Sequence, residues 1–528
     1  METVSNPNAP PAAPRPPAAA PREIELKLSA SPEALAAIRD CDLVARHARN
    51  RGSVRRLHAV YYDTPDRLLD AAGIALRVRR SGSRHVMTVK RPAGDDPLAR
   101  LEWEVPVPDE RPDLSLLPLA EIGEPLADLD PATLVPAFVT RIRRRLMRLD
   151  VEGSEIEIAL DDGEVEAGGT SEPVHEVELE LVKGEPAQLY VFGRALLEVA
   201  PLTLETETKS GRGHRLAYGA GLAARKARPV ALSPQDNVDA ALAAILANGH
   251  AHLVGNISPV LRSGRPEAVH QMRVALRRLR SALTLFRREL GSPALGALTG
   301  EARSLGHALG PARNWDVFAT QTLPTIVQEG LDDVGLAALD EAAAPHRAAS
   351  YERVHAALAS LEVNGFFLSL GAAIERRVWR SDMSGEALGT LGEPIGSFAA
   401  RILSRSHRKV LRRGRHFGRL DPEARHELRL ALKKLRYMVE FFLPLHAGRP
   451  AARRYLARMQ ALQEALGLAN DAATTQELLA TLRAESEAPG LQFAAGAVLG
   501  WQRRAAVEGS RRLRKSWRKF EAATPFWT

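Results

Sequence analysis

The spacing of apolar residues changes near residue 235, and this change restricts the fold of the 528-residue chain more than any other feature. Before it, apolar and charged residues alternate in short runs such as REIELKLSA, IALRVRR and HEVELELVKG, which Gly, Pro and Asp separate. Alternation with a period of two predicts β-strands that each carry one charged face. After it, Ala, Leu and Arg dominate and apolar residues recur every three or four positions, which predicts helices.

These patterns predict an α+β protein with two domains. The Pro- and Ala-rich segment over residues 1–22 is expected to be a disordered tail. A strand-rich domain is predicted over residues 23–220, and a linker over 221–235 follows it. An all-helical domain over 236–520 completes the arrangement.

The sequence also argues against several classes of protein. No run of eighteen apolar residues occurs, so we expect no membrane-spanning helix. The N-terminus lacks the basic and apolar regions of a secretory signal. The single cysteine, Cys41, excludes an intrachain disulfide and a thiolate metal cluster, and it favours the reducing cytoplasm.

The net charge of +8 is unevenly distributed along the chain. Residues 1–220 hold 28 Lys and Arg against 36 Asp and Glu, whereas the remainder hold 44 against 28. A basic helical half indicates a polyanionic partner, although a basic surface can also serve solubility alone. Because aromatic residues make up only 5% of the chain, few side chains can stack on bases, and a nucleic acid is the less favoured polyanion.

Five of the predicted strands carry charged residues at every second position, so each set shares one face of its strand. The five sets are Glu23, Glu25 and Lys27; Arg77 and Arg79; Glu102 and Glu104; Arg141, Arg143 and Arg145; and Glu176, Glu178 and Glu180. One such strand by itself is typical of an ordinary sheet with a solvated face. Five together favour a closed sheet whose charged faces line a wet tunnel, because unpaired buried charge is too costly for a dry core.

A tunnel of this kind suits a phosphate-rich ligand. Arg and Lys bind phosphate oxygens, and Arg does so with two parallel hydrogen bonds. Clustered carboxylates repel one another unless a divalent cation lies between them, and oxygen ligands favour Mg²⁺ or Mn²⁺ over zinc. Bases together with a carboxylate-bound metal are the groups needed to hydrolyse a phosphoanhydride.

Residues 23–220 resemble the CYTH domain, the family of triphosphate tunnel metalloenzymes. The segment Glu23-Ile-Glu25-Leu-Lys27 is similar to the ExExK signature of that family. The elements that follow in the family's order are the LRVRR strand, the TVK strand, the E-x-E strand, the basic strand at 141–145, an LDDG turn at Asp161 and Asp162, ELELVKG and TKSGRG. The resemblance implies an eight-stranded antiparallel tunnel that binds triphosphate together with Mg²⁺ or Mn²⁺.

Carried over by position, this resemblance implies roles for individual residues. The residues expected to grip phosphate are Lys27, Arg77, Arg79, Lys90, Arg141, Arg143 and Lys209. The residues expected to hold metal are Glu23, Glu25, Glu178 and Glu180, with Asp161 and Glu104 nearby. In the basic strand Arg144 interrupts the alternation, so it is the alternative to Arg143 as the inward residue.

The helical domain contains an internal repeat with a period of about 156 residues. The first copy consists of His270, Arg273, Arg277, Arg278 and Arg280, and the second of His426, Arg429, Lys433, Lys434 and Arg436. At about 100° per residue, offsets of about 0, 3, 7 and 10 fall within an arc of about 80°, so each copy forms a cationic stripe. Two such stripes indicate an anionic partner, unless acids on a neighbouring helix pair with them. The repeat predicts two pseudo-symmetric bundles, with one long bundle as the alternative.

These motifs resemble the CHAD domain, a conserved histidine α-helical domain, over about 236–520. The HxxRVxxRRxR pattern is the hallmark of that family, and the LGxxRN element at Arg313 and Asn314 fits it too. The resemblance implies two four-helix bundles around a basic cavity that binds inorganic polyphosphate through both copies of the repeat. Protonated Arg and Lys cannot ligate a metal, so we expect no metal site at the stripes.

The two resemblances together predict a metal-dependent inorganic triphosphatase of the bacterial CYTH–CHAD kind. It would hydrolyse tripolyphosphate to pyrophosphate and phosphate in the tunnel and bind polyphosphate with its helical domain. One alternative keeps the tunnel but changes the substrate to thiamine triphosphate, a nucleoside triphosphate or ATP for cyclisation. Another is a non-catalytic polyphosphate-binding scaffold. The expected location is the cytoplasm, with association with polyphosphate granules as a further option.

Overall fold

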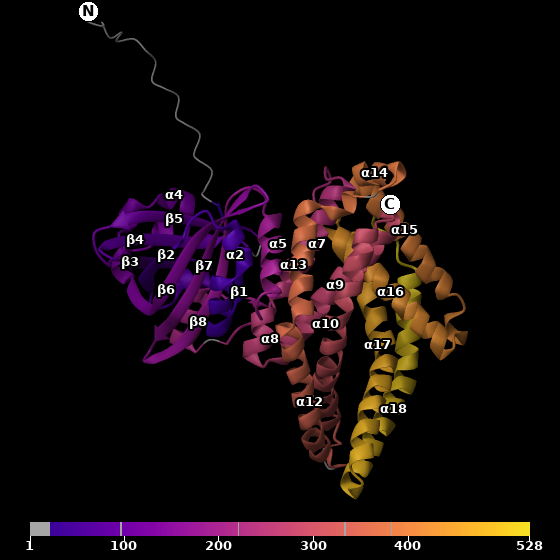
Figure 1. Cartoon of the computed structure of the whole chain (residues 1–528). Coiled ribbons are helices and arrows are strands. Elements are labelled where there is room, and N and C mark those ends of the chain that lie inside the picture. Colours follow the sequence, from indigo (N-terminus) through magenta and orange to yellow (C-terminus); the bar gives the residue numbers. More distant parts are fainter. Residues whose placement is uncertain (1–21, 95–97, 220, 332–333, 382, 528) are drawn as a thin grey trace, which may run out of the picture.

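A β-barrel domain and a helical domain lie side by side in the computed structural model (Figure 1). The structure describes residues 22–94, 98–219, 221–331, 334–381 and 383–527. The predicted disordered tail lies outside the described residues, apart from Arg22. The predicted fold class, an antiparallel barrel followed by an all-helical region, is confirmed.

Eight antiparallel strands form the barrel, and a short ninth strand extends the sheet beside β1. The order around the barrel is β5-β4-β3-β2-β6-β7-β8-β1, and pairing between β1 and β5 closes it. The strands are β1 (Arg22–Ser29), β2 (Ser53–Asp63), β3 (Ala75–Ser81), β4 (Arg84–Pro92), β5 (Ala99–Val107), β6 (Val135–Val151), β7 (Ser154–Ala167), β8 (Thr170–Lys183) and β9 (Thr203–Leu204). Because the sheet closes on itself, every second side chain of a strand points into the barrel.

The long strand β7 corrects one expectation from the sequence. The LDDG segment, which contains Asp161 and Asp162, lies within β7 and does not form a turn. Asp161 pairs with Arg144 of β6 on one side and with a residue of β8 on the other, so the strand continues through the segment. Gly163 suits this position because a Cβ atom there would lie 2.0 Å from the carbonyl oxygen of Arg141. Pairing on both sides therefore overrides the local turn preference of Asp-Asp-Gly.

Short helices surround the barrel and close one end of it. The Oγ atom of Ser31 caps α1 by accepting a hydrogen bond from the Ala34 amide at 3.1 Å. Helix α6 packs against β6, β7 and β8, and a Cβ atom on its Gly213 would lie 2.1 Å from the ring of Phe138. Phe138 and Arg144 share the inward face of β6, so α6 fills one end of the barrel. These helices are α1 (Pro32–Asp40), α2 (Asp42–His47), α3 (Leu68–Ala71), α4 (Leu119–Ile122), α5 (Ala187–Leu197) and α6 (Lys209–Tyr218).

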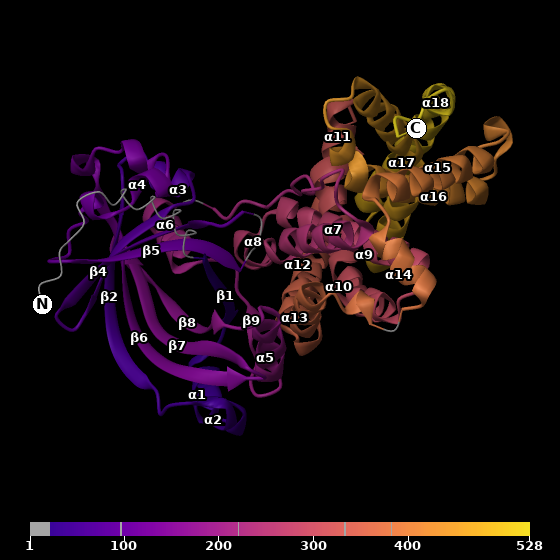
Figure 2. The same ribbon diagram turned by 90° about the horizontal axis from the view of Figure 1, so that it is seen from above.

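The helical domain contains two groups of helices, and each group carries one copy of the repeat (Figure 2). The first group comprises α7 (Val238–Val254), α8 (Ile257–Ser263), α9 (Pro266–Leu290), α10 (Pro293–Val317), α11 (Leu323–Gln328), α12 (Leu336–Ala359) and α13 (Leu361–Arg376). The second group comprises α15 (Ile395–Arg413), α16 (Pro422–Phe442), α17 (Pro450–Glu485) and α18 (Pro489–Glu521). Between the groups in sequence, α14 (Gly385–Gly392) packs against α7 and α9 of the first group. The two copies lie on α9 and α16, and each of these helices packs against the long helix that follows it.

One hydrophobic core runs through both domains. It joins Leu26 of the barrel to Leu253 and Phe367 of the helical domain. Helix α5 packs against α13, where a Cβ atom on Gly371 would lie 2.1 Å from the ring of Tyr190. Apolar side chains therefore fill the boundary between the two domains.

The segment between the domains is held against the helical domain by a buried asparagine. The side-chain amide of Asn256, which follows α7, donates to the carbonyl oxygen of Arg225 at 3.0 Å. Its Oδ1 atom accepts from the Arg225 amide, also at 3.0 Å. Val230 in the same segment is buried as well. The linker therefore packs along α7 and α8.

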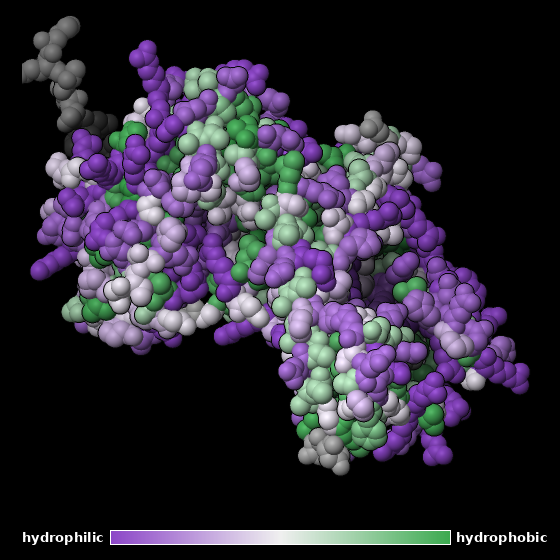
Figure 3. Space-filling view, turned by 60° about the horizontal axis from the view of Figure 1, so that its bottom comes forward, coloured by the Kyte–Doolittle hydropathy of each residue, from purple (hydrophilic) through white to green (hydrophobic). Residues whose placement is uncertain are grey.

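Hydrophilic residues cover most of the face shown in Figure 3, where apolar residues appear in small groups. Among the described residues, no single helix is both long and apolar enough to cross a bilayer. Helices α12 and α13, which are bent by 54° at their junction, meet that test only as a pair.

Candidate functional site

A cavity of about 970 Å³ runs through the barrel, and every strand from β1 to β8 contributes side chains to its wall. Residues of α6, of the linker and of α8 line it as well. Glu25, Arg79 and Glu180 come from three different strands and all line this cavity. The opposite faces are apolar, and Leu26 and Leu28 of β1 are fully buried there. The predicted site residues that line the cavity are Glu23, Glu25, Lys27, Arg77, Arg79, Lys90, Glu104, Glu178, Glu180 and Lys209.

Three carboxylates stand side by side on β1, β8 and β7. Glu25 is in register opposite Glu180, which is in turn opposite Glu157. Like charges at opposed positions repel. Burial and the nearby carboxylates of Glu23 and Glu157 raise the pKa of Glu180 to about 7, and burial also raises the pKa of Glu25. The Oε1 atom of Glu25 is buried and accepts no hydrogen bond, with the ammonium of Lys27 3.5 Å away. This row therefore has negative charge that the protein only partly neutralises.

A second cluster neutralises its own charges. The Nε and Nη2 atoms of Arg144 donate to the two oxygens of Asp161 at 2.7 and 2.6 Å. The ammonium of Lys209, at the start of α6, lies 2.8 Å from Asp161 and 2.7 Å from Glu178. Burial opposes ionisation of Glu178, but Lys209 and Arg144 hold its pKa well below the usual range. These carboxylates are already satisfied by cations, so they are poor candidates for a metal.

A third cluster lines the wall between β3, β4 and β5. The ammonium of Lys90 lies 2.6 Å from Glu23 and 3.3 Å from Glu102. Burial raises the pKa of Glu102 to about 7. Arg77 donates to the hydroxyl of Tyr61 at 3.3 Å, while its Nε–H is buried and donates to no group. An orphaned buried guanidinium donor beside a cavity favours an anionic ligand.

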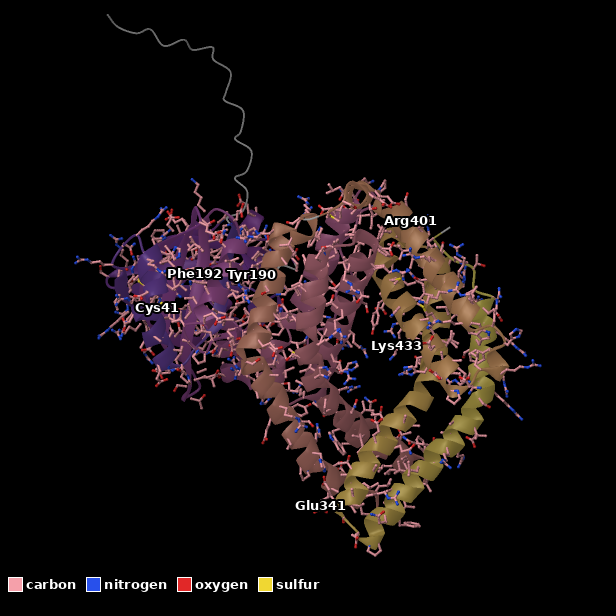
Figure 4. All side chains as sticks on the ribbon, turned by 45° about the vertical axis from the view of Figure 1, so that its right-hand side comes forward. Cys41, Tyr190, Phe192, Glu341, Arg401 and Lys433 are labelled. Atoms are coloured by element: carbon pink, nitrogen blue, oxygen red, sulfur yellow. The ribbon has the colours of Figure 1, made fainter. Side chains whose placement is uncertain are left out.

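In the helical domain, the two cationic stripes lie on helices that contact each other. Figure 4 shows Lys433 pointing from α16 into the space between the two groups of helices. On α9, the guanidinium of Arg273 donates to the carbonyl oxygen of Gly310 at 2.7 Å. Among the side chains that the structure describes, which leave out those of residues 468–471, no carboxylate lies within ion-pair distance of Arg277 or Arg280. The described carboxylates therefore leave these two positive charges unpaired.

Some of the predicted polyphosphate ligands do not belong to this arrangement. Arg278 and Arg436 donate to the same carboxylate, Glu440, at 3.3 and 2.6 Å, so they join α9 to α16. Lys434 is exposed and lies near Lys409 of α15, away from the facing stripes. Arg278 and Arg436 thus already pair with a carboxylate, and the helix turn carries Lys434 to another face than Lys433. Their role in binding polyphosphate stays a prediction. The remaining predicted residues are His270 and Arg429, which are half-buried, and His426, which is exposed.

Both parts of the chain match known families. Residues 21–213 match the model of the CYTH domain. Residues 244–480 match the model of the CHAD domain. The chain carries a CYTH domain followed by a CHAD domain. Both resemblances drawn from the sequence motifs are confirmed.

Several individual proteins are similar to this chain. An inorganic triphosphatase of Haemophilus influenzae is 29% identical over 206 residues, which cover 37% of this chain. The chain spans about half the length of that curated relative, 55%. Among solved structures, the CHAD domain of the plant Ricinus communis is 31% identical over 56% of this chain and 97% of that chain, with a TM-score of 0.48. A protein from Hippeastrum, described as having a dominant triphosphatase activity, is 22% identical over 35% of this chain and 92% of that chain, with a TM-score of 0.28.

The CYTH tunnel corrects the prediction for the basic strand β6. Arg144 faces the cavity, whereas Arg141 and Arg143 are exposed on the outer face of the barrel. The even-numbered residues Phe138 and Ile142 are buried inside the barrel, and their burial sets the register of the strand. Arg144, the alternative to Arg143 from the sequence, is therefore the inward base.

Several charged residues of the CYTH tunnel were not assigned to the site from the sequence. Arg55, Glu102 and Glu157 line the cavity, and Glu176 and Arg212 pair with each other behind Lys209. Glu102 and Glu176 belong to the alternating sets, so the period of two could have found them. Glu157 lies in the alternating run EIEI at 155–158, so the same period could have found it, whereas Arg55 and Arg212 carry no such local signal. Asp161, which was expected near the metal, does not line the cavity, because Arg144 and Lys209 hold its oxygens.

The donor chemistry of the tunnel fits a hard divalent cation. Glu23 is committed to Lys90, and Glu178 lies among cations, so Glu25 and Glu180 are the carboxylates free to bind one. In the described part of the chain, no three side chains form a ready-made metal cage. Mg²⁺ needs none, because it commonly uses one or two carboxylates and takes its other ligands from water and substrate phosphates.

Proposed function

We propose that the chain is a metal-dependent inorganic triphosphatase that hydrolyses tripolyphosphate to pyrophosphate and phosphate in its CYTH tunnel. The observation that carries this proposal is a closed barrel in which the opposed carboxylates of Glu25 and Glu180 share one cavity with the guanidinium groups of Arg77, Arg79 and Arg144. A short ligand of high negative charge, together with a bridging cation, complements both kinds of group. Similarity to the triphosphatase of H. influenzae supports the same reaction.

The basic side chains would bind and orient the phosphate chain. Arg77 has a buried Nε–H that donates to no protein group, so a phosphate oxygen can accept from it. Lys27 and Lys209 add compact charges at the wall of the same cavity. Held in this position, these cations would stabilise the negative charge that develops on the leaving pyrophosphate.

The carboxylates of the tunnel would divide two tasks between them. Glu25 and Glu180 would hold Mg²⁺ or Mn²⁺, which when bound polarises phosphoryl oxygens as a Lewis acid. Glu102 also lines the cavity, and burial raises its pKa to about 7. A carboxylate with such a pKa is suited to accept a proton from the attacking water near neutral pH.

Phosphate release from tripolyphosphate by the purified full chain tests the proposal. We expect activity with Mg²⁺ or Mn²⁺, none after chelation, and severe loss in Glu25→Gln and Glu180→Gln, while Arg143→Gln on the outer face retains activity. A panel of tripolyphosphate, long polyphosphate, thiamine triphosphate and ATP, with chromatography of the products, identifies the substrate and detects cyclisation. A wild-type chain that is inactive on every substrate with both metals would refute hydrolysis and favour the scaffold interpretation.

We also propose that the CHAD domain binds long inorganic polyphosphate. Two observations support this assignment. Among the side chains that the structure describes, no carboxylate lies within ion-pair distance of Arg277 or Arg280 on α9, and Lys433 points into the space between the helix groups. Such binding would tether the enzyme to its substrate and raise the local substrate concentration. A cytoplasmic location with association with polyphosphate granules belongs to the same proposal. Competition between polyphosphate and DNA at fixed salt tests it, because equal competition by DNA would contradict selectivity for polyphosphate.

A further inference from the structure

Two buried carboxylates lie at the boundary between the CYTH and CHAD domains. Glu205 and Glu207 follow β9, and only 3% and 2% of their side-chain surfaces are exposed. Arg262 of α8, in the CHAD domain, donates to both of them, with its Nη2 atom 2.6 Å from Oε2 of Glu205. The hydroxyl of Ser258 on the same helix also donates to Glu205, at 2.7 Å. One short helix of the CHAD domain thus supplies the donors that cross the boundary to this pair.

The ion pairs continue from this boundary into the tunnel. On α6, the Nη2 atom of Arg212 lies 3.4 Å from Glu205 and 3.0 Å from Glu176. Glu176, which is fully buried, lies in turn 2.6 Å from the ammonium of Lys209. The order of contacts is therefore Arg262, Glu205, Arg212, Glu176 and Lys209. Lys209 lines the cavity, whereas Arg262 belongs to the other domain.

We propose that Arg262 of the CHAD domain is a positioning residue for Lys209 of the CYTH tunnel. This inference rests on the proposed triphosphatase function. Arg262 also donates to Glu207, which lines the cavity, while its path to Lys209 runs through Glu205, Arg212 and Glu176. The CHAD domain then has two tasks, which are to bind a polyanion on its stripes and to hold the tunnel's lysine in place.

The physical reason lies in how buried charges share their partners. Without Arg262, Glu205 keeps Arg212 as its nearest cation, and a buried carboxylate takes up whatever cation is left to it. Arg212 then moves towards Glu205 and away from Glu176. Glu176 in turn takes a larger share of the Lys209 ammonium, which withdraws from the phosphate chain. Because Lys209 is expected to hold substrate, we expect Arg262→Gln to raise KM for tripolyphosphate by about tenfold, the value of one charged hydrogen bond.

A double-mutant cycle with Lys209→Gln separates positioning from a general loss of structure. The four proteins are the wild type, Arg262→Gln, Lys209→Gln and the double variant, each measured for kcat and KM on tripolyphosphate. We expect the loss from Arg262→Gln to disappear when Lys209 is already absent, because the two residues act through one path. Equal losses on both backgrounds would overturn the proposal. Arg262→Lys should restore most of the activity, and Arg401→Gln on α15, which removes surface ion pairs of the same domain, serves as the matched control.

A milder variant covers the case in which Arg262→Gln fails to fold. Ser258→Ala keeps Arg262 and removes the 2.7 Å hydrogen bond to Glu205 together with a 3.2 Å contact to the Thr206 hydroxyl, so it should raise KM by a few-fold on the wild-type background and not on the Lys209→Gln background. Unchanged KM in Ser258→Ala and Arg262→Gln alike, with an active wild type, would refute the coupling alone. An inactive wild type would instead refute the triphosphatase function on which the coupling rests.

Discussion

Replacing Arg144 by Met, with Arg143→Met as the matched control, tests the register of strand β6 and the function of the tunnel together. The two residues are neighbours in sequence, but the side chain of Arg144 lies inside the barrel and that of Arg143 lies outside. Both substitutions remove one positive charge and keep a long apolar side chain. Any difference between the two variants therefore reflects where each side chain lies, inside or outside the barrel, and not the net charge of the chain.

The expected loss of stability follows from the contacts of Arg144. Its substitution removes two charged hydrogen bonds to Asp161, which is fully buried, and a third to Glu178. Breaking a buried pair costs about 3–5 kcal/mol, and we take about 3 kcal/mol because Lys209 still pairs with Asp161. For a domain of about 200 residues this corresponds to a fall in Tm of about 6–12 °C. Arg143→Met should change stability by less than about 0.5 kcal/mol, as exposed substitutions do.

We also expect Arg144→Met to lose most of its catalytic activity. Removing one cation that stabilises a developing oxyanion typically costs about a hundredfold to a thousandfold, so kcat/KM for tripolyphosphate should fall by about a hundredfold or more in Arg144→Met. The control should stay within about twofold of the wild type, since surface changes away from a site are near neutral. Thermal unfolding and initial rates of phosphate release, measured below the Tm of both variants, provide the two readouts. Equal effects of the two substitutions, or a larger effect of Arg143→Met, would show that the inward assignment of Arg144 is wrong.

Three further predictions concern pH, metal and the helical stripes. Glu180 has its pKa raised from 4.5 to about 7, so between these values the folded state binds more protons than the unfolded state and the metal-free protein loses stability as pH rises. The side chain in Glu180→Gln cannot ionise, so without metal the Tm of this variant should match that of the wild type near about pH 5 and exceed it near about pH 8. A Tm below that of the wild type at both pH values would contradict the predicted loss of wild-type stability with rising pH. Glu25→Gln should raise the Mn²⁺ concentration for half-maximal hydrolysis by at least about tenfold, measured by metal titration at saturating substrate, and an unchanged midpoint would exclude Glu25 as a ligand. The double variant Arg277→Gln/Arg280→Gln should lower polyphosphate affinity by about tenfold at low salt, and less at high salt, without changing tripolyphosphate hydrolysis, whereas Lys434→Gln should have a smaller effect in the same binding assay.

The residues that face the tunnel could be predicted from the sequence wherever a strand alternates cleanly. Glu23, Glu25 and Lys27 on β1 and Arg77 and Arg79 on β3 all line the cavity, as their spacing indicates. The period of two works there because the pleat of a strand sends successive side chains to opposite faces. The period of two does not show which side chains point inward where charged residues occupy both odd- and even-numbered positions of a strand. The run of arginines at 143–145 is such a case, and the burial of apolar neighbours decides which of them points inward.

Partners from distant segments overrode the turn signal and changed the charge balance of one helical stripe. The LDDG segment has the composition of a turn, but hydrogen bonding to β6 and β8 keeps it in a strand. The stripe on α9 includes Arg278 by its position in the repeat, yet Glu440 of α16 neutralises that charge from 162 residues away. Local pattern thus identified the right elements and the right kind of charge, while partners from distant segments changed what individual residues can do.

The sequence by itself determined the architecture, because alternation and helical periodicity are local properties, and it supplied the charged groups of the tunnel and of the repeat. Only the tertiary structure decided which of those charges remain free. Glu178 and Glu25 look alike on their strands, but Lys209, which is 31 residues further along the chain, satisfies Glu178, while Glu25 keeps an oxygen without a hydrogen bond. The contact of Arg262 with Glu205, across 57 residues and a domain boundary, follows the same rule. Neutralisation depends on distance in space, and that distance exists only once the chain has folded.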